Sequence, residues 1–260
     1  MRSDRRQLML AGLALAAGPG RAAPALRIVS EEAPPFNYTE NGTPMGLCTE
    51  LVQAVLKELQ LHVPIETLPW ARAYDVAQHS SHVLIYSIAR TDQREHLFKW
   101  VGLLTQADYS LFALASRGLK LNQLSDALQL QTATVNADVA EQFLEERGFV
   151  KGRHLQSGSR NELNLEKLRQ RRVDLWITAD VMARHLARQA GQDSQRLLVR
   201  ALPLPELNVS FYMAFGQATP DDQVELFRRG LEAIKRNGQY EQIRRKWQGS
   251  SRDAAEPLAS

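Results

Sequence analysis

The sequence contains a single cysteine, Cys48, among its 260 residues, and its six histidines are scattered. One cysteine cannot form an internal disulfide, and no group of cysteine and histidine has the spacing of a metal site. Stability must therefore come from an apolar core, which about 235 residues are enough to bury. We expect no metal and no cofactor. Cys48 begins an apolar helical segment, so we expect a buried structural thiol rather than a nucleophile.

Long apolar runs are also missing. The run at 8–17 is too short to cross a bilayer as a helix, and no later stretch is apolar enough to anchor the chain. This run follows a basic start with three arginines and precedes the small residues Ala23-Pro24-Ala25. Such a pattern predicts a signal peptide over 1–25, cleaved near Ala25, and export to the periplasm. An ordinary Sec signal is favoured, with a degraded twin-arginine signal as the alternative.

An excess of positive charge is missing once this leader is set aside. The whole chain has 32 basic and 29 acidic residues, a formal charge of +3, but 1–25 hold four arginines and one aspartate. The remaining 28 basic and 28 acidic residues balance each other. The composition therefore argues against nucleic acid or an anionic membrane surface as a partner.

What the sequence does contain is two rounds of alternating strands and helices. The first round predicts strands at 26–30, 63–68 and 83–88, and helices at 47–59 and 71–78. The second predicts strands at 130–135, 173–178 and 197–202, and helices at 138–147, 160–170 and 180–190. This alternation predicts an α/β fold with parallel strands and helices on both faces of the sheet.

Two more extended segments, 109–115 and 208–215, lie between and after these rounds. The rest of the chain is predicted to be helical. Thr219-Pro220-Asp221-Asp222 is typical of a capping box, and Gly238 ends the helix that it begins. A last helix follows at 239–248. We expect the polar tail, 249–260, to be disordered.

The segment 83–100 carries the clearest chemical signal. A buried apolar strand delivers a hydroxyl, Ser87, and two arginines, Arg90 and Arg94, to its carboxyl end. Ligands of open α/β sheets usually bind at that end of the strands. The planar fork of arginine matches a carboxylate in bidentate geometry, so this strand end predicts an anion site.

The run Ser87, Thr91, Arg94 and Phe98 resembles the signature of the family 3 extracytoplasmic solute-binding proteins, the receptor subunits of ABC importers. Further matches in the same order extend the resemblance over 26–248. They are Ala33-Pro34-Pro35-Phe36-Asn37-Tyr38, Asn41-Gly42-Thr43-Pro44-Met45-Gly46, Val173-Asp174, Asn237-Gly238-Gln239-Tyr240 and the stretch 243–247.

The resemblance implies a two-lobed α/β fold, the periplasmic binding protein type II fold, with a mixed sheet flanked by helices in each lobe. The segments 109–115 and 208–215 would be the two hinge strands. Lobe 1 would then be discontinuous, 26–105 plus 209–248, and lobe 2 would be 106–208. The implied function is that of a monomeric receptor, not an enzyme. It would close over a small polar solute and present it to an ABC permease in the inner membrane.

The resemblance also implies a set of ligand-binding residues. Arg94, with Ser87, would hold a carboxylate from lobe 1. Phe36, Tyr38 and Trp70 would wall the ligand with aromatic faces, although loop packing explains Tyr38 and Trp70 equally well. Arg90 either reaches the cleft or, preferably, pairs with Glu31 or Glu32. Lobe 2 would contribute Asp138 and Asp180.

The sequence departs from the family pattern where an amino acid's α-ammonium is usually bound. That position is Ala179, with the acid one residue later at Asp180, and Ala89 replaces a second hydroxyl. Only the carboxylate half of an amino-acid site is clearly present. We therefore predict that an ordinary α-amino acid does not bind in the usual pose, unless Asp138 or Asp180 replaces the missing acid.

Two alternative functions stay open on the same fold. Some relatives of the family are dehydratases of cyclic carboxylates, which need a protonated acid such as Asp138 or Asp180. The chain could also be a sensing subunit that hands its closed form to a membrane receptor.

Overall fold

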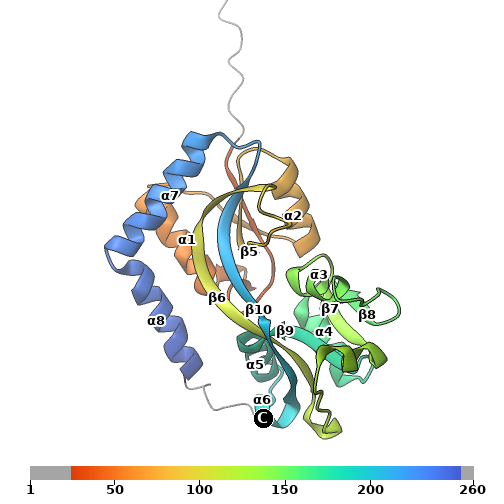
Figure 1. Cartoon of the computed structure of the whole chain (residues 1–260). Coiled ribbons are helices and arrows are strands. Elements are labelled where there is room, and N and C mark those ends of the chain that lie inside the picture. The colour runs from red at the N-terminus through yellow and green to blue at the C-terminus, as the bar shows by residue number, and fades with distance from the viewer. Residues whose placement is uncertain (1–24, 253–260) are drawn as a thin grey trace, which may run out of the picture.

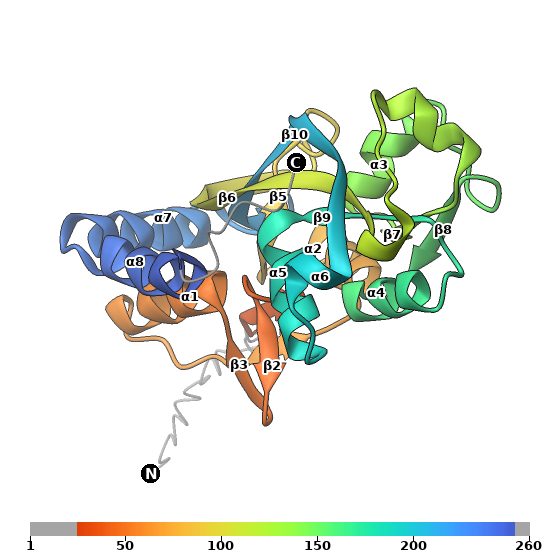
Figure 2. The same cartoon turned by 90° about the horizontal axis from the view of Figure 1, so that it is seen from below.

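A single eight-stranded sheet runs through the whole molecule, in the order β4-β1-β5-β10-β6-β9-β7-β8 (Figure 1). The computed structural model describes residues 25–252. The strands of the sheet are β1 (Arg27–Ser30), β4 (Ile65–Thr67), β5 (Val83–Ala89), β6 (Phe98–Leu114), β7 (Thr132–Val135), β8 (Leu155–Gly158), β9 (Leu175–Ala179) and β10 (Leu198–Gly216). A separate hairpin, β2 (Tyr38–Glu40) with β3 (Thr43–Met45), projects from the body (Figure 2).

The two central strands, β6 and β10, are long and antiparallel, and they pass from one half of the molecule into the other (Figure 1). At one end β10 pairs with β5, and at the other β6 pairs with β9. The register of β10 shifts between Leu204 and Asn208, where the two halves meet. The predicted segments 197–202 and 208–215 are therefore one continuous strand, and 109–115 is the second part of a 17-residue strand. Periodicity in the sequence did not show this continuity, because bulges interrupt it.

The half that contains both ends of the described chain is called lobe 1. Its strands β4, β1 and β5 are parallel. The helices α1 (Leu47–Glu58), α7 (Asp221–Arg236) and α8 (Gln239–Arg252) pack together on one side, and α2 (Trp70–His79) lies on the other (Figures 1 and 2). Every residue of β5 is buried, as expected for a strand covered on both faces.

The other half is called lobe 2. In it β7 runs parallel to β8 and β9, while β9 is antiparallel to β6. Its helices are α3 (Val139–Glu145), α4 (Asn161–Arg169), α5 (Asp180–Gln189) and α6 (Ser194–Leu197), and two short 3₁₀ helices span Ala115–Arg117 and Leu124–Gln129. The strand β8 was not predicted, since its sequence Leu-Gln-Ser-Gly has no apolar alternation. The residue limits of the two lobes stay a prediction.

Two local predictions from the sequence have opposite outcomes. Asp138 is the N-cap of α3, as predicted, and its Oδ1 accepts a hydrogen bond from the Glu141 amide at 2.7 Å. The capping box at the start of α7 is wrong. No side chain caps that helix, and the Thr219 hydroxyl instead accepts a hydrogen bond from the His82 amide at 3.1 Å.

The larger of two hydrophobic clusters extends through both lobes and includes the fully buried Cys48, and a smaller one lies between α2 and the sheet. The predicted burial of Cys48 is confirmed, and burial raises the pKa of its thiol to about 12. In the part of the chain that the structure describes, no helix has the length and apolar character needed to cross a membrane.

The predicted signal peptide lies outside the described residues except for its last residue. The helix α8 includes four residues of the predicted tail, and the rest of that tail lies outside as well.

Candidate functional site

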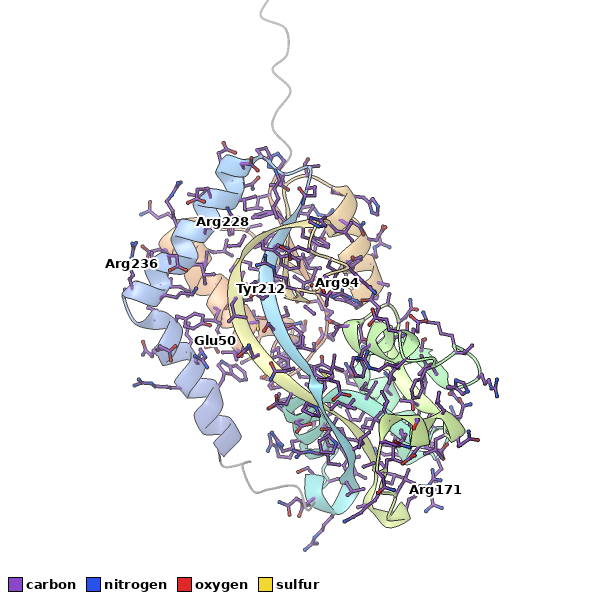
Figure 3. All side chains as sticks on the ribbon, in the orientation of Figure 1. Glu50, Arg94, Arg171, Tyr212, Arg228 and Arg236 are labelled. Atoms are coloured by element: carbon purple, nitrogen blue, oxygen red, sulfur yellow. The ribbon has the colours of Figure 1, made fainter. Side chains whose placement is uncertain are left out.

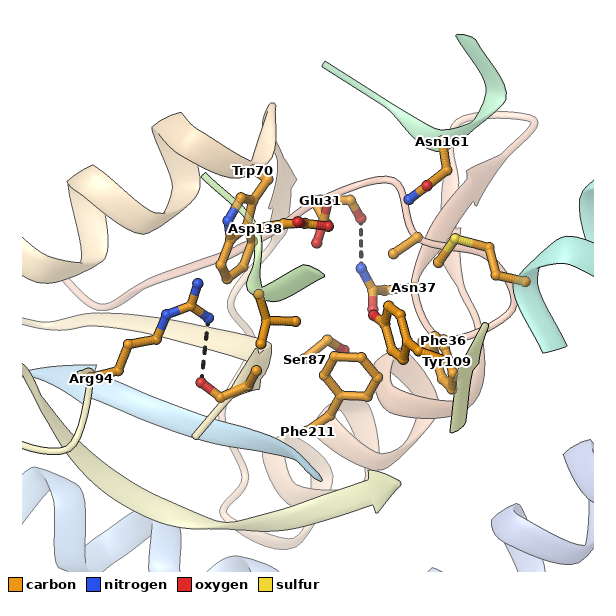
Figure 4. Close-up of a pocket in the computed structure, with 14 residues that line it drawn as sticks. Glu31, Phe36, Asn37, Trp70, Ser87, Arg94, Tyr109, Asp138, Asn161 and Phe211 are labelled. Atoms are coloured by element: carbon orange, nitrogen blue, oxygen red, sulfur yellow. Dashed lines mark hydrogen bonds between the residues drawn. The ribbon is translucent and has the colours of Figure 1, made fainter. Parts of the chain in front are cut away.

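A small cavity of about 30 Å³ lies between the two lobes (Figure 4). Lobe 1 and the adjoining strand β10 contribute Glu31, Ala33, Phe36, Asn37, Trp70, Ser87, Ala89, Arg94 and Phe211. Lobe 2 contributes Tyr109, Asp138, Val139, Asn161 and Met182. We call it the interlobe cavity. Its walls come from both lobes, so the structure shows the lobes closed on each other.

Ser87 reaches the interlobe cavity because the backbone of β5 is irregular at that residue. Its neighbours Tyr86 and Ile88 pair with the consecutive residues Met213 and Tyr212, which leaves Ser87 as a bulge. Ser87 has a φ of 58°, a left-handed conformation that costs energy in a residue other than glycine. Its hydroxyl is buried next to the Cys48 thiol, and no described residue accepts a hydrogen bond from it. A strained residue with an unsatisfied hydroxyl at a cavity is typical of a binding site.

Arg94 is almost fully buried, at 1% exposure, and forms no salt bridge with any described residue. Its Nη2 donates to Gln142 Oε1 at 3.0 Å and to the Ala137 carbonyl at 3.4 Å, whereas its Nε has no partner. The guanidinium carbon lies 5.3 Å from the ring centre of Trp70 and 5.1 Å from that of Tyr74. Burial lowers the pKa of Arg94, because the charge has left water. Figure 3 shows it where α2 approaches α3.

The Ala137 carbonyl is a contact point between the lobes. It accepts hydrogen bonds from two lobe 1 side chains, Trp70 Nε1 at 2.9 Å and Arg94 Nη2 at 3.4 Å. Ala137 also has a left-handed φ, 59°, and its amide donates to Glu141 Oε1 at 2.8 Å. Glu141 itself is buried against Lys151 at 2.7 Å. The turn before α3 is therefore held by lobe 2 in a conformation that lobe 1 recognises.

Two carboxyl groups face the interlobe cavity, one from each lobe. Glu31 follows β1 in lobe 1, and Asp138 begins α3 in lobe 2 (Figure 4). Burial, and to a lesser extent the nearby Asp138, raise the pKa of Glu31 to about 8. Burial also raises the pKa of Asp138 to about 7, against the effect of its capping hydrogen bond to Glu141. No salt bridge of either carboxyl is found in the described part of the chain.

The floor of the cavity is aromatic, with one polar group set into it. The rings of Phe36 and Phe211 lie 5.1 Å apart, and Tyr109 adds a third ring from lobe 2. Asn37 is 1% exposed, and its Nδ2 donates to the Glu31 backbone carbonyl at 2.7 Å. Its Oδ1 accepts no hydrogen bond from any described residue.

Five of the eight predicted site residues line the interlobe cavity: Phe36, Trp70, Ser87, Arg94 and Asp138. Tyr38 lies outside it, with its ring 5.6 Å from that of His185 and near Trp247. Their presence in one cavity is a structural observation. Their role in binding stays a prediction.

Arg90 and Asp180 also lie outside the cavity, and each is held by a charged partner elsewhere. Arg90 forms a two-bonded pair with Glu95 at 2.5 and 2.7 Å and lies over the ring of Trp100 on the surface. The predicted pairing of Arg90 with Glu31 or Glu32 is therefore wrong, because Glu95 is closer along the same turn. Asp180 pairs with Arg200 at 2.6 Å within lobe 2. The change of side-chain direction at the end of β9 turns it away from the cavity.

Several cavity residues were not predicted as ligand contacts: Glu31, Asn37, Tyr109, Asn161, Met182 and Phe211. A signal for Glu31 was present, since it directly follows the first strand at the carboxyl end where ligands bind. Asn161 and Met182 had no such signal. They lie in the first turns of α4 and α5 in lobe 2, and only the packing of one lobe on the other brings them to the cavity.

A comparison with protein families matches residues 26–250 to the family described as bacterial extracellular solute-binding proteins, family 3. No curated protein sequence gives a significant match. Among solved structures, a histidine kinase sensor domain with similarity to periplasmic binding proteins superposes with a TM-score of 0.76 at 21% identity, covering 85% of this chain and 95% of that one.

Two further similar structures are binding proteins. The arginine-, lysine-, histidine-binding protein ArtJ from Geobacillus stearothermophilus has a TM-score of 0.74 at 19% identity, covering 86% of this chain and 96% of its own. An ancestral amino acid-binding protein, a precursor of cyclohexadienyl dehydratase, has a TM-score of 0.71 at 17% identity, covering 85% and 94%. At these identities the similarity shows the fold and not the ligand.

Proposed function

Because the chain belongs to the family 3 bacterial extracellular solute-binding proteins, we propose that it is a receptor that closes two lobes over a small carboxylate solute. The resemblance stated from the sequence is confirmed by the family match, and the predicted two-lobed α/β fold is confirmed by the superposed structures. We further propose that the receptor is a periplasmic monomer without a cofactor. It would deliver its solute to an ABC permease in the inner membrane.

The observation that carries this proposal is the unpaired guanidinium of Arg94. A charge buried without a counterion is costly, and neutral oxygens of Gln142 and Ala137 are its lobe 2 partners. A ligand carboxylate would supply the missing charge, and it could accept hydrogen bonds from Arg94 Nε and from the unsatisfied Ser87 hydroxyl. Charge compensation thus favours a solute with a carboxylate.

Closure would couple binding to delivery. The closed form is bridged by the hydrogen bond from Trp70 to Ala137 and by those from Arg94 to Ala137 and Gln142. A solute that touches both lobes would add contacts that the open form cannot make, so it would shift the population toward closure. The permease would then recognise the closed form.

A thermal-shift screen of the exported protein with amino acids and organic acids tests the proposal, since a bound ligand raises the apparent stability. We expect at least one carboxylate to raise the melting temperature. Arg94→Ala should then weaken its binding by about 2–5 kcal/mol, the range for removing one partner of a buried charge pair. Arg90→Ala is the matched control, since Arg90 is exposed and pairs with Glu95, and it should bind as the wild type does.

Two results would contradict the proposal. One is a screen in which no carboxylate stabilises the protein. The other is a carboxylate ligand that Arg94→Ala and Arg90→Ala bind equally well.

A second candidate function is an enzyme of the dehydratase type, favoured by the position of Glu31 in the cavity without a salt bridge to any described residue, where burial raises its pKa to about 8. A carboxyl that keeps its proton at neutral pH can act as a general acid. Incubation of cyclic carboxylates with the protein, followed by NMR, separates the two functions. A receptor returns its ligand unchanged, whereas a dehydratase consumes it.

A further inference from the structure

We propose that Glu141, a buried carboxylate of lobe 2 outside the interlobe cavity, positions the turn on which lobe 1 closes. Glu141 lies in the first turn of α3 and does not line the cavity. Its side chain holds Ala137, whose carbonyl accepts hydrogen bonds from Trp70 and Arg94 of lobe 1. This inference rests on the lobe closure of the proposed receptor, and it adds a positioning residue to it.

The side chain of Glu141 is 0% exposed, and each carboxylate oxygen accepts from two donors. Oε1 accepts from the Ala137 amide at 2.8 Å and from Lys151 Nζ at 2.7 Å. Oε2 accepts from Thr134 Oγ1 at 2.6 Å and from the Ser157 hydroxyl. A carboxylate can be buried at a bearable cost only when it is surrounded in this way.

These donors keep Glu141 ionised. Burial acts against the charged form, but the hydrogen bonds from the four donors together outweigh it, and the pKa of Glu141 lies below its ordinary value. Hydrogen bonds to an ionised acceptor are about twice as strong as those between neutral groups. Glu141 therefore holds the Ala137 amide more firmly than a neutral side chain would.

The contact with Ala137 is not the one that a helix start requires. In a capping box, the carboxylate at the third helical position returns to the amide of the N-cap residue. Glu141 is at that position and Asp138 is the N-cap, but the carboxylate reaches one residue further, to Ala137. The Asp138 amide donates instead to the Val135 carbonyl at 3.2 Å. Glu141 therefore shapes the turn that precedes the helix.

Both peptide planes that flank Ala137 are held by these two bonds. Glu141 fixes the plane that contains the Ala137 amide, and the bond from Asp138 to Val135 fixes the plane that contains the Ala137 carbonyl. The φ of Ala137, 59°, is strained in any residue except glycine. Without the carboxylate, Ala137 would relax toward an ordinary φ, and its carbonyl would turn away from lobe 1.

Lobe 1 depends on the direction of this carbonyl. Trp70 Nε1 donates to it at 2.9 Å and Arg94 Nη2 at 3.4 Å. Arg94 Nη2 also donates to Gln142 Oε1 at 3.0 Å, on the residue that follows Glu141 in α3. A hydrogen bond weakens steeply as its angle departs from linearity, so a turned carbonyl would weaken both bonds to Ala137.

Lys151 extends this network to the surface of lobe 2 and provides a matched control. Its side chain is 45% exposed, and it also contacts Glu145 at 3.4 Å. Glu141 and Glu145 thus belong to the same helix and meet the same lysine. Because Glu141 is the one that accepts from the Ala137 amide, a change at Glu145 removes a charge beside Lys151 without releasing the turn.

Hydrogen exchange of the Trp70 indole N–H, followed by heteronuclear NMR of the ligand-free exported protein, tests the inference. This N–H belongs to lobe 1 and its acceptor to lobe 2, so opening of the lobes exposes it to water. Trp70→Phe identifies its signal among those of the four tryptophans. Trp100 is the internal control, because its indole donates to the Glu95 carbonyl within lobe 1.

We expect Glu141→Gln to speed the exchange at Trp70 about fivefold, because a neutral acceptor holds the Ala137 amide less strongly. Glu141→Ala removes the acceptor and should speed it about tenfold or more. Glu145→Gln should exchange as the wild type does, and Trp100 should exchange at one rate in all variants. Melting curves show which variants fold. If Glu141→Ala does not fold, Glu141→Gln against Glu145→Gln decides.

Ala137→Gly separates positioning from general stability. Glycine adopts a left-handed φ without steric cost, so the turn no longer needs the carboxylate to hold it. Added to Glu141→Gln, Ala137→Gly should return the exchange at Trp70 toward the wild-type rate. A variant that only loosened the packing of lobe 2 would not be repaired in this way.

Three results would overturn the inference. They are equal exchange at Trp70 in the wild type and both Glu141 variants, an equal acceleration in Glu145→Gln, and no repair by Ala137→Gly. None of these measurements uses a solute. A thermal-shift screen in which no carboxylate binds would therefore remove the proposed function and leave the role of Glu141 in closure standing.

Discussion

Four residues in or beside the interlobe cavity are in energetically unfavourable states. Ser87 and Ala137 have left-handed backbones, Arg94 has a buried charge without a counterion, and Asn37 has an unsatisfied acceptor. Each state costs free energy in the ligand-free protein. All lie in or beside one cavity. A solute that relieves several of these costs at once can gain affinity without a large contact area.

Ser87 allows backbone strain and ligand contact to be separated. Ser87→Gly and Ser87→Ala both delete the hydroxyl, but glycine accepts the φ of 58° without the steric cost of about 1–2 kcal/mol that alanine keeps. Urea unfolding should show Ser87→Gly to be the more stable of the two. Both should lose affinity for the carboxylate probe, by about 1.5–3 kcal/mol in calorimetry for a hydrogen bond to a charged group. Full affinity in Ser87→Ala would mean that the hydroxyl does not touch the ligand.

The residues of the site differ in how well the sequence predicts them. Ser87 and Arg94 follow a buried strand within one short segment, so their common location follows from local chain geometry. Asn161 and Met182 depend on the placement of a second lobe, which no local pattern encodes. Arg90 looks like Arg94 in the sequence, but Glu95, five residues along, holds it at the surface.

At the scale of secondary structure, the loop between β1 and α1 controls the lobe 1 side of the cavity. It carries Phe36 and Asn37, and its turn passes so close to itself that a Cβ on Gly46 would lie 2.4 Å from the Phe36 carbonyl oxygen. Gly46 also has a φ of +114°, whereas Gly42 in the same loop has open space around it.

These two glycines form a matched pair. We expect Gly46→Ala to lower the free energy of unfolding by about 2–4 kcal/mol, because the backbone must shift to avoid the clash. Gly42→Ala should lower the free energy of unfolding by only about 1–2 kcal/mol, because the left-handed backbone is strained but no atom clashes with the added Cβ. Denaturant unfolding of both variants measures the difference. Equal stabilities would show that the loop adapts without cost.

Trp70, the first residue of α2, provides an element-scale test of closure. Trp70→Phe removes the hydrogen bond to the Ala137 carbonyl but keeps an aromatic ring beside Arg94. The loss of this hydrogen bond should destabilise the closed form relative to the open form by about 0.5–1.5 kcal/mol. Small-angle scattering of the ligand-free variant should show a larger radius of gyration than the wild type. An unchanged radius would mean that other contacts hold the lobes together.

Elements with strong periodicity were predicted well, and those that depend on pairing were not. The helices α1, α2, α4 and α5 lie within two residues of their predicted limits. The strand β8 and the continuity of β10 were missed, since both follow from neighbours far away in the sequence. Propensity and periodicity report only local preference.

At the scale of the whole molecule, the two cavity carboxyls link stability to pH. The pKa of Glu31 is raised by burial to about 8 and that of Asp138 to about 7. A carboxyl whose pKa rises on folding stabilises the protein below its unfolded pKa, and this contribution is lost as the pH rises through the folded pKa. The melting temperature of the ligand-free protein should therefore contain a component that falls from about pH 4 to about pH 8.

Melting curves at several pH values across this window check the prediction. Glu31→Gln and Asp138→Asn should each flatten the fall, because an amide does not titrate. Glu66 pairs with Arg27 on an exposed edge, and Glu66→Gln should keep the wild-type slope. A slope that is the same in all four proteins would assign the pH dependence to other groups.

The two long strands that join the lobes also set the order in which the chain can assemble. In lobe 1, Ala89 of β5 pairs with Phe211 of β10, and the whole of lobe 2 is inserted between them. Most pairings of β7, β8 and β9 join residues much nearer in sequence. Contacts between distant residues form slowly, because a large loop must close first. A chain emerging from its N-terminus would thus hold β5 without its β10 partner until lobe 2 had been made, so the lobe that appears first would be the last to be completed.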